Sequence, residues 1–168
     1  IYPEGNFSLT WRLLLPASAS GGVRPIETYG YLSDQLSLAE RMVLGGSGLI
    51  MMVGPTNSGK STALQAFARR IMILREGACK VVTIENPVEY EIPGAFQMSA
   101  KAENFSDYLK ATLRQDPNVV VVGEIRDNEA AAVVQDIVTA GHKILTTLHV
   151  RDVSSVFDRL KGLGVPLD

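Results

Sequence analysis

Residues 49–62 read Leu-Ile-Met-Met-Val-Gly-Pro-Thr-Asn-Ser-Gly-Lys-Ser-Thr, and this stretch decides the fold. From Gly54 to Ser61 it matches the phosphate-loop pattern G-x-x-x-x-G-K-[S/T]. An apolar strand is predicted over 49–53, directly before the loop, and a helix over 59–74, directly after it. A chance glycine-rich turn is the alternative reading, but a strand and a helix at the required positions argue against it.

The loop is predicted to hold the phosphates of ATP. Its glycines let backbone N–H groups curl around the phosphates, and the helix that follows presents its positive end to them. Lys60 adds a charge against the β- and γ-phosphates, and Ser61 is placed to ligate Mg²⁺. The predicted nucleotide-binding residues are Gly54, Pro55, Thr56, Asn57, Ser58, Gly59, Lys60, Ser61 and Thr62.

Further apolar runs alternate with helical patterns after the loop. The runs are rich in Val, Ile and Leu and fall at 49–53, 80–84, 119–122 and 144–148. The helical patterns fall at 59–74, 105–115, 127–140 and 153–163. Strands that are apolar on both faces and alternate with helices are typical of a parallel sheet covered on both sides, so we expect an α/β fold.

The N-terminal part has a different pattern. Residues 7–15 alternate apolar and polar, which predicts a strand with one buried face, and 16–25 are rich in Ser, Gly and Pro, which indicates a linker. We therefore expect 1–30 to be the end of a preceding domain with its linker, and 31–168 to be a C-terminally truncated core. A helix is predicted over 34–44; Ser33 and Ser37 are candidate N-caps, and Glu40, three residues after Ser37, favours the second.

Composition limits the class of protein. The 168 residues are 46% hydrophobic and 20% charged, which suits one well-buried domain. A formal net charge of −2 argues against a nucleic-acid surface extending over the whole chain. The one cysteine, Cys79, cannot form an internal disulfide and fits a buried position in a cytoplasmic protein. No apolar run approaches the roughly 18–20 residues that span a bilayer, so membrane contact is expected only through partners.

Polar side chains follow the other three predicted strands. Glu85, Glu124 and His149 come at or just after their carboxyl ends, which is where ligands bind in open α/β sheets. A carboxylate next to a buried strand is costly unless it meets a cation or a polarised water. Taken singly, each acid is also compatible with a solvated loop position. His149 could hydrogen-bond the γ-phosphate or a product phosphate, whereas a role for His142 stays open.

Four blocks together resemble the hexameric secretion ATPases of type IV pili and type II secretion. They are the phosphate loop at 54–62; Thr-Ile-Glu-Asn-Pro-Val-Glu-Tyr at 83–90, similar to the aspartate box; 113–127, similar to the Walker B stretch; and 139–149, similar to the histidine box. With the segments between them they cover about 47–163. The resemblance implies a RecA-like P-loop domain.

The resemblance also implies roles for individual residues. Lys60 and Ser61 would bind phosphate and Mg²⁺. Glu85 would be the catalytic glutamate that polarises water, and Glu124 would hold Mg²⁺ through a water molecule. ATP would bind in the cleft between an N-terminal domain and this one.

Around these residues the resemblance is less complete. His149 and His142 would belong to the histidine box, and Arg126 would steady the acids or a subunit contact. Asn86 stands where the aspartate box usually has Asp, and Gly123 stands where most P-loop ATPases have the Walker B Asp. Glu124 is therefore left alone to serve the metal. Arginine fingers are not assigned; the candidates are Arg12, Arg24 and Arg114.

The expected function is an ATP-hydrolysing motor subunit that drives type IV pilus biogenesis or type II secretion. Such a subunit would form a homo-hexamer in the cytoplasm, peripheral to the inner membrane, and would contact a platform protein of that membrane. Two alternatives remain: a nucleic-acid motor, disfavoured by the acidic charge balance, and a non-catalytic nucleotide switch, disfavoured by Glu85 and Glu124. A small-molecule kinase is weaker, because no arginine-rich lid segment follows the third strand.

Overall fold

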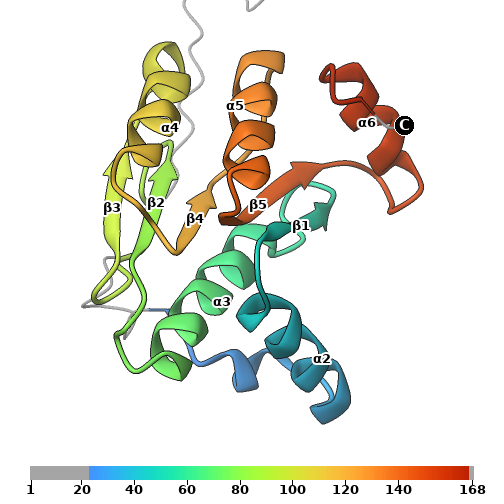
Figure 1. Ribbon diagram of the computed structural model, residues 1–168. Helices are drawn as coiled ribbons and strands as arrows, with labels where there is room; N and C mark the ends of the chain where they lie inside the picture. The colour runs from blue at the N-terminus through green and yellow to red at the C-terminus, as the bar shows by residue number, and fades with distance from the viewer. Residues whose placement is uncertain (1–22, 167–168) are drawn as a thin grey trace, which may run out of the picture.

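The computed structural model describes residues 23–166, which form a sheet covered by helices (Figure 1). The strands are β1 (Gly48–Gly54), β2 (Val81–Glu85), β3 (Phe96–Ser99), β4 (Val119–Val122) and β5 (Lys143–His149). The α-helices are α2 (Ser33–Leu44), α3 (Lys60–Leu74), α4 (Phe105–Leu113), α5 (Asn128–Thr139) and α6 (Ser155–Gly162). Two short 3-10 helices, η1 (Ile26–Tyr29) and η2 (Ala102–Asn104), complete the described elements.

All strand pairs in the sheet are parallel. The spatial order is β1-β5-β4-β2-β3, and Val121 of β4 lies opposite Thr83 of β2 and Leu145 of β5. Because every strand runs the same way, their carboxyl ends share one edge of the sheet. The predicted parallel α/β architecture is confirmed.

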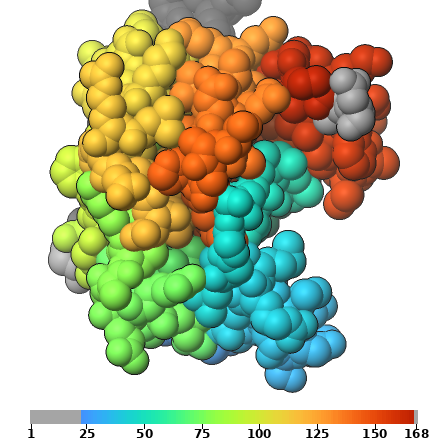
Figure 2. All heavy atoms as spheres, in the orientation of Figure 1, coloured from blue at the N-terminus to red at the C-terminus, as the bar shows by residue number. Residues whose placement is uncertain are grey.

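A hydrophobic core covers each face of the sheet. On one face α4, α5 and α6 share a hydrophobic core with β4 side chains such as Val120 and Val122. On the other, η1, α2 and α3 share a core with Val119, Val121 and Leu145. Figure 2 shows these layers, with α4 and α5 in yellow and orange above α3 and α2 in green and blue. Each valine of β4 is buried because successive side chains point to opposite faces.

One strand was not predicted from the sequence. β3 adds to the edge of the sheet beside β2 and consists of Phe-Gln-Met-Ser, with Phe96 exposed. A four-residue edge strand with no buried residue lacks the continuous apolar run by which the buried strands were recognised. It supplies Gln97, which matters for the site described below.

The predicted N-cap of the first helix is wrong. α2 begins at Ser33 with Leu32 before it, and the backbone N–H of Leu32 donates to Gln35 Oε1 at 3.0 Å. Ser37 lies inside the helix, where its hydroxyl donates to the carbonyl of Ser33 at 2.8 Å. The side chain of Gln35 therefore caps the helix about one turn before Ser37, which the spacing of Ser37 and Glu40 favoured as the N-cap.

The strand predicted over 7–15 lies outside the described residues. From Val23 onwards the chain packs onto α3: Val23 and Ile26 are buried in the same core, and the guanidinium of Arg69 donates to the Val23 carbonyl. Cys79 is buried, and burial raises the pKa of its thiol, as expected for a packing role. None of the helices within 23–166 is both long and apolar enough to cross a membrane.

Candidate active site

The predicted phosphate loop connects β1 to α3. β1 ends at Gly54 and α3 begins at Lys60, after Gly59 in a left-handed conformation with φ of 87°. Gly54 has φ of 151°, and a Cβ added there would lie 2.8 Å from the hydroxyl oxygen of Ser58. The loop therefore folds back closely on itself only because position 54 carries no side chain.

Lys60 lies at the start of the helix with only 8% of its surface exposed. Its Nζ donates to the carbonyl of Pro55 at 2.6 Å, so the ammonium sits over the loop. A buried ammonium beside the first turn of α3 adds its charge to the positive end of the helix. This combination of donors suits a phosphate group.

Glu85, the last residue of β2, is buried with 6% exposed, and its carboxylate accepts hydrogen bonds from three side chains. Thr83 Oγ1 donates to Oε1 at 2.8 Å. Gln97 Nε2 donates to the same oxygen at 3.3 Å, and Gln65 Nε2 donates to Oε2 at 3.2 Å. These bonds compensate for much of the cost of burying the carboxylate and fix its orientation.

Glu124 follows β4 and lies between two basic groups. Arg126 Nε donates to its Oε2 at 2.7 Å, and His149 Nε2 lies 3.5 Å from its Oε1. The His149 contact is an ion pair only when the imidazole is protonated. Glu124 is more accessible than Glu85, with 23% of its side chain exposed, as a group that meets a ligand should be.

Gly123 lies beside Glu85, where the ends of β4 and β2 meet. A Cβ at this position would be in ordinary van der Waals contact with Glu85, 3.4 Å from its Cα and 3.6 Å from its Cγ. On the other side, Thr147 Oγ1 of β5 donates to the Gly123 carbonyl at 2.6 Å. Gly123, which stands where most P-loop ATPases have the Walker B aspartate, is therefore a direct neighbour of Glu85.

One cavity of about 170 Å³ brings part of the predicted site together. Of the nine predicted nucleotide-binding residues, Ser61 lines this cavity, whereas Lys60, Thr62 and the loop residues 54–59 do not. Among the residues that line it are Ser61, Glu85, Glu124, Arg126 and His149. These residues come from α3 and from the carboxyl ends of β2, β4 and β5, as the strand-end argument anticipated.

Other candidates lie away from this cavity. The ring Nδ1 of His142 is 2.9 Å from the carbonyl of Pro117, at the amino end of β5. Arg24 and Arg114 are exposed and do not line the cavity, and Arg12 falls outside the described residues.

Three residues that hold Glu85 were not singled out from the sequence. Gln65 lies one helical turn after Ser61 and is 2% exposed, an unusual burial for an amide in an otherwise apolar stretch. Thr83 points to the same face of β2 as Glu85, two residues before it. The polar residues Gln65 and Thr83, each in an otherwise apolar stretch, could have indicated these contacts from the sequence. Gln97 could not, because β3 was not predicted.

The donor set also suits a nucleotide that carries Mg²⁺. Magnesium is commonly held by one or two protein oxygens, with phosphates and waters completing its octahedron. The Ser61 hydroxyl and the Glu124 carboxylate are oxygen ligands of this kind, and both line the cavity beside the phosphate loop. The residues present are therefore compatible with both ATP and the metal.

Comparison with known proteins identifies the family of the chain. Residues 6–168 match the family described as type II/IV secretion system protein. The chain is 37% identical over 143 residues to the type II secretion system protein HxcR of Pseudomonas aeruginosa, covering 83% of this chain and 30% of the relative. It is 36% identical over 157 residues to the type IV pilus assembly ATPase PilB of Thermus thermophilus, covering 92% of this chain and 17% of the relative.

Solved structures share the fold. The Legionella pneumophila ATPase DotB superimposes with a TM-score of 0.70 at 29% identity, covering 83% of this chain and 39% of that one. The pilus retraction motor PilT with bound ADP gives 0.68 at 26% identity, covering 87% and 42%. The predicted RecA-like fold is thereby confirmed, although the chain spans less than a third of these two curated relatives. This chain belongs to the type II/IV secretion system protein family.

Proposed function

We propose that this chain is the nucleotide-hydrolysing part of a motor ATPase that drives type IV pilus biogenesis or type II secretion. The observation that carries the proposal is the shared cavity, in which Ser61 of the phosphate loop meets Glu85 and Glu124 from two other strand ends. Relatives with secretion and pilus-assembly names, and the ADP-bound PilT structure, support the choice of nucleotide and process.

The binding step uses the phosphate loop. The backbone N–H groups of the loop, which every residue of 54–59 except Pro55 carries, and the start of α3 would surround the β- and γ-phosphates, and Lys60 supplies charge against them. Ser61 and Glu124 would hold Mg²⁺. When bound there, the metal would neutralise charge on the phosphates and lower the barrier to transfer. Arg126 and His149 hold Glu124 in place from either side.

The hydrolytic step depends on Glu85. Its carboxylate orients a water molecule towards the γ-phosphorus and accepts the proton as the bond from that phosphorus to the ADP oxygen breaks. The hydrogen bonds from Thr83, Gln65 and Gln97 hold the carboxylate ready for this role. An acid with this support is needed for hydrolysis and is superfluous in a pure nucleotide switch.

Membership of the family supports a proposal for the wider setting of the protein. The protein works as a homo-hexamer at the cytoplasmic face of the inner membrane, contacts a platform protein there, and converts hydrolysis into extension, retraction or export of a pilin-like protein. ATP would bind between an N-terminal domain and this one.

Two substitutions in the full-length protein test the proposal. Lys60→Ala should abolish Mg²⁺-dependent ATPase activity by weakening phosphate binding. Glu85→Gln should retain ATP binding while lowering turnover by about 10²- to 10⁴-fold, the usual contribution of a positioned general base. Phosphate release and nucleotide affinity are measured for both.

Matched controls use exposed residues outside the cavity. Lys161→Ala and Glu103→Gln make the same chemical changes and should leave turnover unchanged. Wild-type turnover in Lys60→Ala and Glu85→Gln would refute the motor assignment. ATP binding by the wild-type hexamer without any phosphate release would favour a switch, and salt-sensitive stimulation by DNA or RNA would favour a nucleic-acid motor.

A further inference from the structure

Glu85 is held by side chains from three different elements. Thr83 belongs to its own strand, Gln65 to α3, and Gln97 to the edge strand β3. Two of these donors have simple structural settings: Thr83 is fixed within β2, and Gln65 lines the cavity itself. Gln97 is different from both, because it belongs to a neighbouring strand and, unlike Gln65, does not line the cavity.

The amide of Gln97 has a second set of partners in the segment between β2 and β3. Its Oε1 accepts the backbone N–H of Ile92 at 2.6 Å, and its Nε2 donates to the carbonyl of Tyr90 at 3.0 Å. The other hydrogen of Nε2 is directed to Glu85 Oε1 at 3.3 Å. The acceptor oxygen and both N–H groups therefore all have partners, and the donor to Glu85 is oriented by the backbone of residues 90–92.

The same segment also borders the cavity. Asn86, Pro87 and Glu89 line it, directly after Glu85 and just before the two backbone groups that Gln97 binds. The first residues of the segment 86–95 thus line the cavity, and the backbone of the residues that follow binds the Gln97 amide. A change in this segment can reach the Glu85 carboxylate through one side chain.

We propose that Gln97 is a positioning residue that sets the orientation of the Glu85 carboxylate according to the conformation of residues 86–95. The inference rests on the proposed hydrolytic function and adds to it a residue that acts through Glu85 without touching the nucleotide. Its loss should lower the rate of the chemical step and leave nucleotide affinity largely intact. A misplacement of about 1 Å in a catalytic group can cost on the order of 10²-fold in rate.

The experiment uses Gln97→Met in the full-length protein, since methionine has a similar length and no amide. We expect kcat to fall about 10- to 100-fold, with the Kd of a non-hydrolysable ATP analogue changing by less than about threefold. Hydrogen exchange of the Ile92 amide should also become faster, because its acceptor is lost. Gln135→Met, the same change at an exposed position of α5, is the matched control and should match wild type.

A second variant removes the donor of Gln97 and keeps its acceptor. Gln97→Glu keeps an oxygen for the Ile92 N–H, but it can donate to neither Glu85 nor the Tyr90 carbonyl, and it places a like charge beside Glu85. We expect its kcat to be at least as low as that of Gln97→Met. Near-normal turnover in Gln97→Glu would show that Glu85 needs no donor from this position and would overturn the proposal.

The outcomes distinguish this inference from the proposed function. Wild-type kcat in Gln97→Met, together with loss of turnover in Glu85→Gln, would remove Gln97 from the mechanism and leave the ATPase assignment intact. Wild-type kcat in Glu85→Gln would remove the assignment itself. A parallel loss of affinity and kcat in Gln97→Met would show general damage to the site and would also overturn the positioning role.

Discussion

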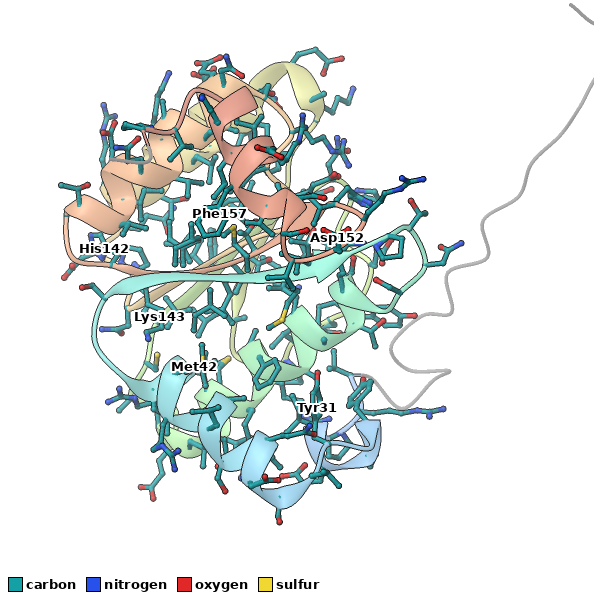
Figure 3. The ribbon with its side chains drawn as sticks, turned by 90° about the vertical axis from the view of Figure 1, so that its right-hand side faces the viewer. Tyr31, Met42, His142, Lys143, Asp152 and Phe157 are labelled. Carbon is teal, nitrogen blue, oxygen red and sulfur yellow. The ribbon has the colours of Figure 1, made fainter. Side chains whose placement is uncertain are left out.

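The two ends of β5 contain similar polar residues in different surroundings. At its carboxyl end, His149 lies 3.5 Å from the Glu124 carboxylate and lines the cavity. At its amino end, His142 contacts the Pro117 carbonyl and Lys143 donates to the Met42 carbonyl at 2.6 Å. Figure 3 shows His142 and Lys143 at one end of the sheet, with Met42 of α2 beside them, and Asp152 towards the other end.

The difference lies in what the polar groups face. At the amino end of β5 the partners of His142 and Lys143 are backbone carbonyls, which are a fixed part of the folded chain. Both side chains therefore complete the hydrogen bonding of neighbouring elements. At the carboxyl end the partners are ionisable side chains that border a cavity and can exchange partners when a ligand binds. We therefore propose that position relative to the strand direction separates a structural histidine, His142, from a functional one, His149, at the two ends of β5.

Among the substitutions that compare the two ends of the sheet, the largest loss of ATPase activity is expected at Ser61, at the carboxyl end. Ser61→Cys in the full-length protein should lower Mg²⁺-supported ATPase activity by more than about 100-fold, because a thiolate is a poor ligand for a hard cation. Replacing Mg²⁺ with Mn²⁺ or Cd²⁺ should restore part of the activity, because these softer ions accept sulfur. Turnover is measured with each metal in turn.

Ser61→Ala is the control for metal rescue. It has no ligand atom at this position and should stay inactive with every metal. If Ser61→Ala keeps wild-type turnover with Mg²⁺, then Ser61 does not hold the metal, and the two ends of the sheet differ less than we infer.

An intermediate effect separates the two histidines. His149→Ala should lower kcat about 10- to 100-fold, as expected when the partner of a metal-holding group is removed, with little change in stability. His142→Ala should leave kcat unchanged and lower the free energy of unfolding by about 1 kcal/mol, because it loses one hydrogen bond. Turnover and urea unfolding are measured on both; the reverse pattern would contradict the comparison.

The smallest effect concerns Lys143. Burial, with the nearby charge of Arg75, lowers the pKa of this lysine in the folded protein. The folded protein then loses the proton at lower pH than the unfolded chain does, so stability increases as pH rises through the lowered pKa towards the unfolded value of about 10.4. The urea midpoint of wild type should rise between neutral and alkaline pH relative to Lys143→Met.

The control for Lys143 is the exposed Lys161. Lys161→Met should show the same pH dependence of the urea midpoint as wild type. An identical pH dependence in wild type and Lys143→Met would show that burial at the amino end has no energetic consequence.

Much of the fold followed from local patterns. Val119–Val122 was predicted to its observed ends, and the strand before the phosphate loop differs from β1 by a single residue at each end. β4 is buried on both faces, so the apolar run itself marks it, whereas β1 at the edge of the sheet is partly buried and was recognised from its place before the loop. β3 was missed because it is only four residues long and none of them is buried. The helix cap at Leu32 was missed because a nearby glutamine acts in place of Ser37.

Part of the site was also predictable from the sequence, because it lies at the ends of the predicted strands. Glu85, Glu124 and His149 could be placed together because the ends of parallel strands share an edge. The partners of Glu85 could not, because Gln65 is 20 residues away and Gln97 is 12 residues away along the chain. The Gln97 contact depends on β3 lying beside β2, and local periodicity does not encode the order of strands in a sheet.

The most direct test of the central claim is a single-turnover measurement on the full-length Glu85→Gln variant with bound ATP and Mg²⁺. If strand-end acids act on a nucleotide held by the phosphate loop, ATP should bind with near-normal affinity and remain uncleaved on the timescale of many wild-type turnovers. Cleavage of the bound ATP at the wild-type rate would contradict the claim, because Glu85 would then have no part in hydrolysis.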